Sequence, residues 1–328
     1  MQSIEICAGA GGQALGLEQA GFSHVALVEI DKDACNTLKT NRPNWNVING
    51  DVKEFNASQY FGIDLFAGGV PCPPFSVAGK QLGMEDERDL FPEAIRLIGE
   101  CLPKAVLLEN VRGLLNPKFD TYRQHITEQI TSLGYVCSWK MLNANHFGVP
   151  QLRPRTLMVA LRPEYVKYFK WPEQAQRITL TVGETLYREM ASHGWEGAHE
   201  WALIANDIAP TLVGGSKKHG GADLGPTRAR LAWKKLGIDG SGLADNPPMP
   251  GFIGNPKLTV RMASLIQGFP KDWIFTGKKT PSYRQVGNAF PPPVAKAVGT
   301  EIRKALVQGD WINHTESDEY EQAVGVTR

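Results

Sequence analysis

The sequence predicts an α/β fold, in which a doubly wound sheet forms a large domain and a second, smaller domain accompanies it. Up to about residue 172, short apolar runs typical of buried strands alternate with helical stretches, and most runs end in glycine or in a polar side chain. From about residue 173 this alternation gives way to segments rich in Gly, Pro, Lys and Trp. With 328 residues, 42% of them hydrophobic, the chain can bury a large core and form the second domain.

The first forty residues predict a nucleotide-binding site. A strand over residues 3–7 leads into the glycine-rich segment AGAGG, and a helix follows over residues 14–21. Gly9, Gly11 and Gly12 allow a tight turn and a close approach of a ligand to a helix N-terminus. The spacing of these glycines is not GxGxxG, and the sequence lacks the GxxxxGK[ST] pattern of phosphate-binding loops.

Acidic side chains at the ends of the next two strands extend this site. The strand over residues 24–31 ends in Glu29 and Asp31, and Asp51 follows the strand over residues 45–49. In doubly wound nucleotide-binding folds, an acid at the tip of the second strand accepts hydrogen bonds from ribose hydroxyls. We therefore expect Glu29 to bind a ribose and Asp51 to meet an adenine amine.

The segment GGVPCPPFS, residues 68–76, places one cysteine at the end of a buried strand. Prolines stop the apolar run 63–70, so Cys72, between Pro71 and Pro73, lies where the strand gives way to a loop. A thiol at that position is a candidate nucleophile. An isolated cysteine can also be inert packing, because cysteine is among the most buried residue types.

An acid and two arginines are placed at the ends of two further strands. A strand over residues 105–110 ends with Glu109, and the next apolar strand, over 155–162, is entered through Arg153 and Arg155. Parallel α/β sheets bind their ligands at one edge, so the thiol, the acid and the guanidinium groups are expected to meet in one cleft. Each group alone could be a plain surface or core residue, but their joint occurrence favours a site.

Composition excludes several classes of protein. The five cysteines form no CxxC pair, so we expect neither a disulfide framework nor a metal site. This cysteine usage favours a reducing, cytoplasmic setting. The start of the chain has no basic region, and no run of about 18 apolar residues occurs, so we expect neither a signal peptide nor a membrane span.

The net charge of +1 argues against a general polycation, but the charges are unevenly distributed. Between residues 211 and 235, six lysines and arginines accompany a single acid, Asp223, in a Gly-rich segment. That pattern suits contacts to phosphates, although a solvated loop would look the same. The nearby Trp195, Trp201 and Trp233 are expected in the core of the small domain rather than as stacking platforms.

A series of segments, in order along the chain, resembles the motif series of the DNA cytosine carbon-5 methyltransferases of bacterial restriction-modification systems. The segments are AGAGGQALGLEQAGF, VEID, GDV, GGVPCPPFSVAGKQ, LLENVRG, QLRPRTLMVALR, RMASLIQGFP and YRQVGNAF. The series runs from residue 4 to about residue 299, so it covers nearly the whole chain. The PC, ENV, QxRxR and QVGNA elements together make the resemblance highly specific.

The resemblance implies a Rossmann-like, S-adenosylmethionine-dependent methyltransferase domain and a smaller target-recognition domain. The catalytic and cofactor-binding domain would span residues 1–172 and be completed by residues 281–309, where the last helix folds back onto it. The target-recognition domain would span residues 173–280, and residues 310–328 would form a mobile tail.

The resemblance also implies a reaction, the transfer of a methyl group from S-adenosylmethionine to carbon 5 of a cytosine that is swung out of duplex DNA. Cys72 would add to carbon 6 of the base, which makes carbon 5 nucleophilic. Glu109, protonated because burial raises its pKa, would bond ring nitrogen 3 and the exocyclic amine. Arg155, with Arg153 as a second partner, would bond the base carbonyl and Glu109.

By the same resemblance, a set of small, acidic and apolar residues would surround the cofactor. They are Ala8, Gly9, Ala10 and Gly12 at the methionine end, Glu29 at the ribose, Ile30, Asp51 and Val52 around the adenine, Pro71 and Leu90 at the wall, and Asn288 and Ala289 on the far side. Two positions depart from the family, because Cys7 replaces a usual aromatic residue and Ile30 stands where many members have a larger side chain. Both departures should weaken adenine stacking and modestly lower the affinity, and Cys7 is a candidate second reactive thiol.

Candidate DNA contacts lie in a loop over residues 73–90, which by resemblance closes over the DNA, and in the recognition domain. They are Ser76, Lys80 and Arg88 in the loop, and Thr211, Lys217, Lys218, Arg228 and Arg230 in the recognition domain. The expected partner is double-stranded DNA, and a cognate restriction endonuclease would act on the same site without forming a stable complex. We expect a monomer that is associated with the nucleoid in the cytoplasm and has no membrane contact.

Three alternatives stay open at this point. A tRNA cytosine methyltransferase would share all the catalytic motifs, although the long segment between QLRPR and RMASL favours a DNA-reading domain. A nicotinamide oxidoreductase would use the glycine-rich loop but leaves PC and ENV unexplained. A non-catalytic DNA-binding module would be expected to lack Cys72, Glu109 or Arg155, and all of them are present.

Overall fold

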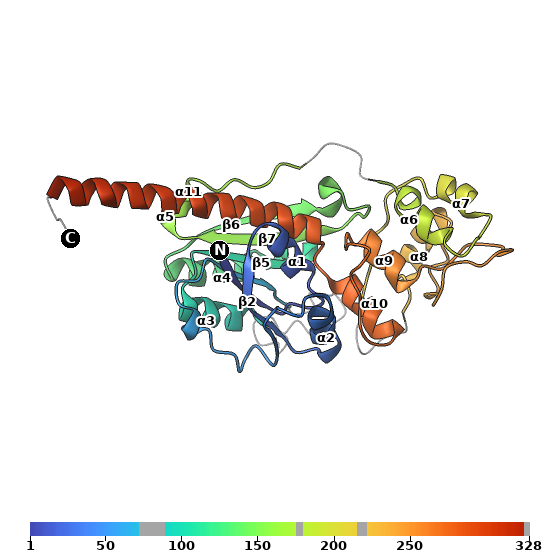
Figure 1. Ribbon diagram of the computed structural model, residues 1–328, viewed down its shortest axis with the longest axis horizontal. Coiled ribbons are helices and arrows are strands. Elements are labelled where there is room, and N and C mark those ends of the chain that lie inside the picture. The colour runs from blue at the N-terminus through green and yellow to red at the C-terminus, as the bar shows by residue number, and fades with distance from the viewer. Residues whose placement is uncertain (72–88, 175–179, 215–221, 325–328) are drawn as a thin grey trace.

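A computed structural model describes residues 1–71, 89–174, 180–214 and 222–324, with side chains described up to residue 312 (Figure 1). Its centre is a seven-stranded sheet with the strand order β3-β2-β1-β4-β5-β7-β6. The strands are β1 Gln2–Ile6, β2 Ser23–Glu29, β3 Val47–Asn49, β4 Leu65–Gly69, β5 Ala105–Val111, β6 Val136–Asn143 and β7 Pro154–Leu161. The predicted α/β fold with a doubly wound sheet is confirmed.

One strand reverses the direction of the sheet and thereby positions the site. Strands β1 to β5 run parallel to one another, whereas β7 runs antiparallel to both of its neighbours, β5 and β6. The reversal brings the start of β7 to the carboxyl end of β5, with Arg155 opposite Val111. An arginine at the entrance of one strand therefore lies at the same edge as an acid at the exit of the other.

Helices cover both faces of the sheet, because successive strand residues point to opposite sides. On one face, apolar residues of β1, β4 and β5 pack with α3 (Phe91–Cys101) and α4 (Asp120–Ser132). On the other face, Leu65 and Leu107 pack with α1 (Gly12–Gln19) and α11 (Pro292–Val324). Helices α1 and α11 approach closely because Gly16 has no side chain, and a Cβ there would lie 2.4 Å from the Pro292 carbonyl oxygen. Helix α2 (Lys32–Asn41) follows β2.

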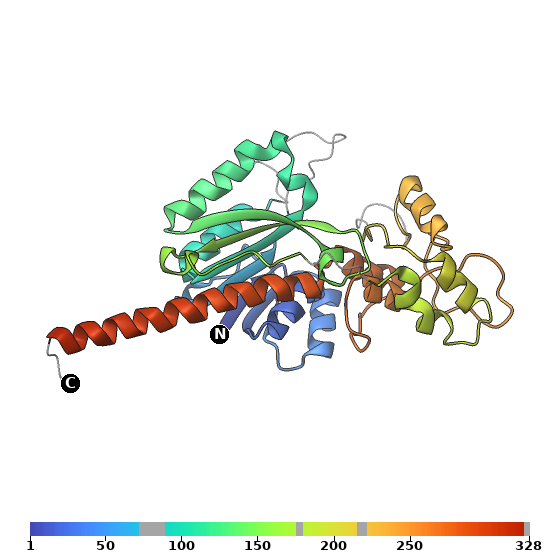
Figure 2. The ribbon, with the colours of Figure 1, turned by 90° about the horizontal axis from the view of Figure 1, so that it is seen from above.

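Helix α11 returns the chain to the large domain and then continues beyond it. Its first part packs on the sheet through Val294, Val298 and Ile302. The helix runs without interruption to Val324, through most of the segment that the sequence predicts to be a mobile tail. Figures 1 and 2 show its C-terminal part projecting past the sheet. The mobility of this segment stays a prediction.

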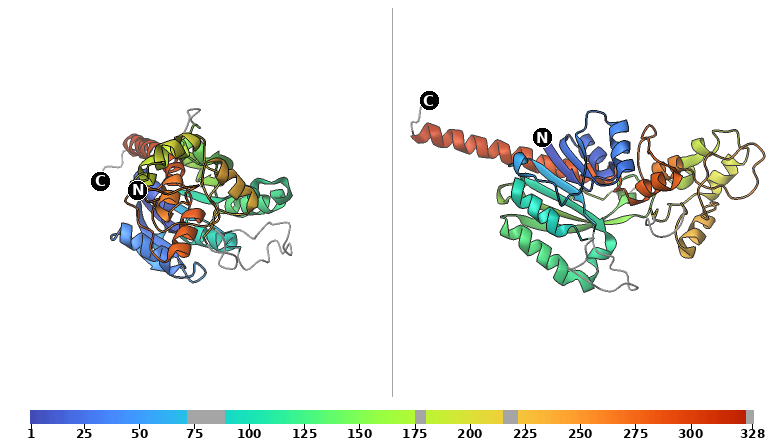
Figure 3. Two further views of the ribbon diagram at one scale, coloured as in Figure 1. Left: turned by 90° about the vertical axis from the view of Figure 1, so that its right-hand side faces the viewer. Right: turned by 90° about the horizontal axis from the view of Figure 1, so that it is seen from below.

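The remaining helices gather at one end of the sheet and have a core of their own (Figure 3). They are α6 Val182–Met190, α7 Ala198–Ile204, α8 Thr227–Lys235, α9 Val260–Ile266 and α10 Lys279–Asn288, while the short α5, Pro163–Val166, follows β7. Trp195, Trp201 and Trp233 are buried in this core, as expected. Tyr283 and Val286 of α10 also belong to it, so α10 is part of the small domain's core although its C-terminal end borders the large domain's cleft. In the part of the chain that the structure describes, no helix is long and apolar enough to cross a membrane.

Candidate active site and cofactor cleft

A cleft of about 300 Å³ opens at the carboxyl edge of β1, β2 and β4. Every residue that the sequence assigned to the cofactor lines it: Ala8, Gly9, Ala10, Gly12, Glu29, Ile30, Asp51, Val52, Pro71, Leu90, Asn288 and Ala289. The lining also includes residues that sequence reasoning did not assign, among them Glu5, Gln13, Pro281, Arg284, Gln285 and Phe290. The volume is at the lower end of the range for small-molecule sites.

The glycine-rich loop turns as its composition requires. Gly9 and Gly11 adopt left-handed φ angles of 54° and 85°, which glycine adopts without strain. Gly12 begins α1 in contact with the segment after α10, because a Cβ at this position would lie 2.1 Å from the Phe290 carbonyl oxygen. The N-terminal loop and the far wall of the cleft are therefore held together by a backbone contact.

Glu29 is fixed at the end of β2 by main-chain donors. Its Oε2 accepts a hydrogen bond from the Gly9 N–H and its Oε1 accepts one from the Asp31 N–H, each at 2.7 Å. Burial raises the pKa of Glu29, and the hydrogen bonds from Asp31 and Gly9 oppose that shift. Asp31, by contrast, caps α2 by accepting from the Asp33 and Ala34 N–H groups, which assigns it to the helix end.

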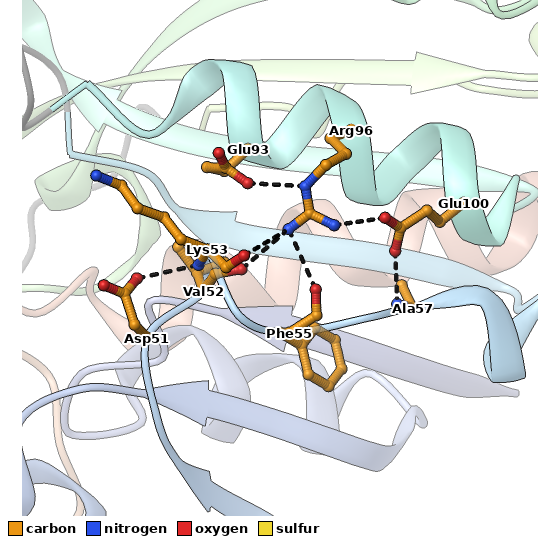
Figure 4. Close-up of polar contacts among 8 residues, drawn as sticks. All are labelled: Asp51, Val52, Lys53, Phe55, Ala57, Glu93, Arg96 and Glu100. Carbon is orange, nitrogen blue, oxygen red and sulfur yellow. Dashed lines mark hydrogen bonds and ion pairs between the residues drawn. The ribbon is translucent and has the colours of Figure 1, made fainter.

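Helix α3 holds the segment that presents Asp51 and Val52 to the cleft (Figure 4). One nitrogen of the Arg96 guanidinium donates to the carbonyl oxygens of Val52, at 3.2 Å, and of Phe55, at 3.1 Å. Arg96 is itself held by Glu93 and Glu100, one helical turn away on each side. Sequence reasoning missed this arginine, although the spacing of the two acids around it is the signal that could have found it.

Glu109 and Arg155 form a buried ion pair at the mouth of the cleft. The Arg155 Nε lies 2.7 Å from the Glu109 Oε1, and both residues are only 9% exposed. Burial raises the pKa of Glu109, whereas the positive charges of Arg155 and Arg153 lower it, and the net direction is upward. The adjacent Asn110 donates from its Nδ2 to the Val70 carbonyl oxygen at 2.8 Å. This contact fixes the end of β4 that leads into residue 72.

Several predicted site residues lie outside the described residues. They are Cys72, Ser76, Lys80, Arg88, Lys217 and Lys218. Of the other DNA candidates, Thr211 donates from its hydroxyl to the Leu152 carbonyl oxygen, and Arg228 and Arg230 lie exposed on α8. Their roles stay predictions.

Arg153 differs from the expectation that it would be a second partner of the base and of Glu109. Its guanidinium is fully buried and donates to the carbonyl oxygens of Leu212 at 2.7 Å, Gly287 at 2.6 Å and Ala289 at 2.9 Å. The side chain therefore points toward the main chain of Leu212 and of the C-terminal end of α10. In a regular strand, residues 153 and 155 would point to the same side. Residue 153, however, precedes β7, and the chain just before it pairs with residue 209 instead of continuing the strand, so the period of two does not extend to Arg153.

Two buried polar side chains at the inner end of the cleft were also missed. Glu5 is 1% exposed, and its Oε2 has no hydrogen-bond partner in the structure, as is also true of the Gln13 Oε1. Burial raises the pKa of Glu5 well above its ordinary value, and the charge of Glu29 adds to the shift. The signal in the sequence was an acid within the otherwise apolar start of the first strand.

The surroundings of Cys7 disfavour its role as a second reactive thiol. Burial, reinforced by the charges of Glu29, Glu5 and Asp51, raises the pKa of Cys7 to about 12. Because the thiolate is the nucleophilic form, a thiol with this pKa is unreactive at neutral pH.

Comparison with known proteins identifies the family. A family model described as C-5 cytosine-specific DNA methylase matches residues 1–219 and 250–304. The Type II methyltransferase M.NgoMIV of Neisseria gonorrhoeae is 60% identical over 307 residues, which cover 93% of this chain and 97% of that protein. The Type II methyltransferase M.NaeI of Lentzea aerocolonigenes is 58% identical over 312 residues, which cover 93% of this chain and 75% of that protein.

Solved structures share the fold at lower identity. A prophage-encoded Escherichia coli protein described as a DNA modification methyltransferase matches with a TM-score of 0.67 at 24% identity, covering 93% of this chain and 99% of that chain. DNMT2 of Spodoptera frugiperda matches with a TM-score of 0.62 at 16% identity, with the same coverage of 93% and 99%. These likenesses concern the fold alone. From the family model and the relatives, the expected enzyme class, DNA (cytosine-5-)-methyltransferase, is confirmed, and the chain belongs to the C-5 cytosine-specific DNA methylase family.

Proposed function

We propose that this protein transfers a methyl group from S-adenosylmethionine to carbon 5 of a cytosine in a specific duplex DNA sequence, as the modification enzyme of a restriction-modification system. The observation that carries the proposal is the buried pair of Glu109 and Arg155, which lies beside a ligand cleft and beside the chain that leads into Cys72. The names of the 58% and 60% identical relatives support DNA methylation of the Type II systems.

The cleft fits the cofactor by its chemistry. Glu29 offers a carboxylate suited to ribose hydroxyls, and Asp51 and Val52 would recognise the adenine. Gly9 leaves open space for a ligand near the N-terminus of α1. The unpartnered Oε2 of Glu5 provides an acceptor at the inner end. When bound there, S-adenosylmethionine supplies the methyl group.

Glu109 and Arg155 would hold the flipped cytosine. A protonated Glu109 can donate to ring nitrogen 3 and accept from the exocyclic amine, and its raised pKa favours that form. Arg155 contacts Glu109 through Nε, so its remaining N–H groups can reach the carbonyl of the base. The addition of the Cys72 thiolate at carbon 6 would make carbon 5 nucleophilic. Glu109 and Arg155 together would stabilise the negative charge that this addition places on the ring.

The proposal includes the unconfirmed parts of the sequence-based assignment. We assign residues 1–172 and 281–309 to the catalytic domain and 173–280 to target recognition, with α10, Lys279–Asn288, crossing that boundary. Action as a monomer in the cytoplasm, alongside a restriction endonuclease that reads the same site, stays a prediction.

Bisulfite sequencing tests the function and finds the target in one experiment. Plasmid from cells that express the protein should carry 5-methylcytosine at one short sequence, and plasmid from cells that express Cys72→Ser should carry none. Unmethylated plasmid together with 5-methylcytosine in tRNA would contradict the proposal and favour a tRNA methyltransferase.

A further inference from the structure

The buried guanidinium of Arg153 contacts segments that are far apart in the sequence. It donates to Leu212, a buried residue in the core of the small domain, and to Gly287 and Ala289, at the C-terminal end of α10. No carboxylate is among these acceptors. The carbonyls at a helix C-terminus carry partial negative charge, so the end of α10 stabilises the buried cation.

The same contacts connect two binding regions. Ala289 and its neighbour Asn288 line the cofactor cleft, whereas Leu212 lies in the basic segment that is expected to meet DNA. Two residues beyond Arg153, Arg155 holds Glu109. The Arg153 side chain is therefore hydrogen-bonded both to Leu212 of the basic segment and to Ala289 at the wall of the cleft. It also lies two residues before Arg155, at the start of β7.

Backbone packing makes this connection stiff. A Cβ at Gly287 would lie 2.3 Å from the Gly214 nitrogen, and a Cβ at Gly214 would lie 2.3 Å from the Asn288 Oδ1. Gly214 thus rests directly on the end of α10, with no room for a side chain at Gly214 or at Gly287. Gln151 accepts from the Leu212 N–H at 2.8 Å, and Gln267 donates to the Ala289 carbonyl oxygen at 2.5 Å. A shift of residues 211–214 must move Asn288 and Ala289 as well.

We propose that Arg153 is a positioning residue that couples the binding of duplex DNA to the binding of S-adenosylmethionine. Duplex DNA that fixes the position of residues 211–214 also fixes Asn288 and Ala289 at the far wall of the cofactor cleft, through Arg153. Conversely, bound cofactor favours the position of residues 211–214 that binds DNA. Such coupling is reciprocal, because it is one free energy shared by two sites. The inference rests on the proposed function, since it takes duplex DNA and S-adenosylmethionine as the two ligands.

Arg162 provides a matched control at the opposite end of β7. Its guanidinium also donates to main-chain carbonyl oxygens, from Nε to Pro103 at 3.1 Å and from a terminal nitrogen to Leu102. These acceptors lie neither in the recognition segment nor among the residues of the cleft. Replacement of either arginine by lysine keeps the charge and removes the planar fork.

The test measures the affinity for S-adenosylhomocysteine by calorimetry, without and with a duplex that carries the methylated sequence. For the wild type we expect the duplex to tighten binding roughly tenfold, within the usual range of coupling between sites. In Arg153→Lys the two affinities should agree within about twofold, and in Arg162→Lys the tenfold difference should persist. A residue that only supported the fold would lower stability without removing the difference.

A second variant keeps the proposal testable if Arg153→Lys does not fold. Gln267→Met removes a second donor to Ala289 and the acceptor of the Gln151 Nε2, and Gln151 in turn bonds Leu212 and Arg153. The variant therefore breaks the same network without leaving a buried charge unpaired, and it should reduce the difference. Retention of the full difference in the folded variants, or its absence in the wild type, would overturn the proposal. If the wild type still methylates plasmid in that case, the proposed function remains supported. If the protein does not bind S-adenosylhomocysteine at all, the result counts against the proposed function itself.

Discussion

Burial sets the protonation of the acids and thiols around the cleft. The pKa values of Glu5, Glu109 and Cys7 are all raised, with desolvation as the largest cause in each case. Only Glu109 has an arginine against it, and that arginine opposes the shift. A protonated Glu109 is the form that can donate to a ring nitrogen, so burial favours the form that the proposed chemistry needs.

The covalent role of Cys72 predicts a trapped complex. Duplex DNA with 5-fluorocytosine at the target should become linked to the protein in the presence of S-adenosylmethionine, because fluorine at carbon 5 cannot leave as a proton does. Cys72→Ser should form no complex, since a hydroxyl is far less ionised than a thiol, whereas Cys137→Ser should form it normally. Denaturing gels and peptide mapping of the crosslink measure this. Attachment at another cysteine, or full methylation by the serine variant, would remove Cys72 from the role.

The buried Glu5 predicts a dependence of stability on pH. Its pKa is raised in the folded protein above the ordinary value of 4.5, so between the two values the folded state binds more protons than the unfolded state. The free energy of unfolding must then fall as the pH rises through that window. Glu5→Gln removes this titration, so the free energy of unfolding of the variant relative to that of the wild type should rise between pH 4 and pH 8.

Urea unfolding at both pH values checks this prediction. Glu29 and Glu109, whose pKa values are also raised, are present in both proteins, so the comparison reports Glu5 together with its interaction with Glu29. The exposed Glu200→Gln is the control and should show the wild-type dependence. An unchanged pH dependence in Glu5→Gln would mean that Glu5 is ionised in the folded protein.

At the scale of elements, the placement of helices and strands positions the residues of the site. Arg96 on α3 holds the segment after β3, and the reversal of β7 brings Arg155 to Glu109. Six of the seven strands of the sheet were predicted, because each is a short apolar run with a clear end, whereas β6, Val136–Asn143, was missed because polar and apolar residues are mixed along it. The reversal of β7 was not, since apolar periodicity is the same in either direction and the partner of a strand depends on distant chain.

The hold of α3 on the segment of Asp51 and Val52 predicts a remote effect on cofactor affinity. Arg96→Met should weaken binding of S-adenosylhomocysteine by about tenfold, because the Val52 and Phe55 carbonyls lose their donor and Asp51 loses its fixed position. Arg123→Met is a matched control, since Arg123 pairs with Asp120 on α4 and donates to the Leu114 carbonyl, away from the cleft. Calorimetry on both variants decides, and equal affinities would show that α3 does not control the site.

At the scale of the whole molecule, a net charge of +1 leaves DNA binding to local groups of basic residues. All twelve residues that the sequence assigned to the cofactor line the cleft, since most of them lie in contiguous motifs at strand ends, but about half of its lining was not assigned. The arrangement around Arg153 could not, because it joins residues 153, 212 and 287, whose proximity arises only from the packing of the two cores. The burial of Glu5 was not predicted, because the burial of a single strand residue depends on the distant chain that covers it.

Phosphate contacts by the basic segment predict a change in salt dependence. Lys217→Ala combined with Lys218→Ala should weaken binding to all duplexes and reduce the slope of log affinity against log salt by about 2, while the methylated sequence stays the same. Fluorescence anisotropy at several salt concentrations measures the slope, and bisulfite sequencing checks the site. Relaxed site choice at an unchanged slope would instead make these lysines base readers.

The packing of α1 against α11 has a consequence for how the chain is made. Helix α1 ends at Gln19 and α11 begins at Pro292, so a ribosome adding about 5 to 20 residues per second needs roughly 15 to 55 seconds to supply the second helix after the first. During that interval Leu17 and Ala20, which are buried in the finished protein, lack the surface that covers them. The nascent chain therefore exposes an apolar helix face for most of its synthesis, and we expect ribosome-bound chains shorter than about 290 residues to be held by chaperones that recognise such faces.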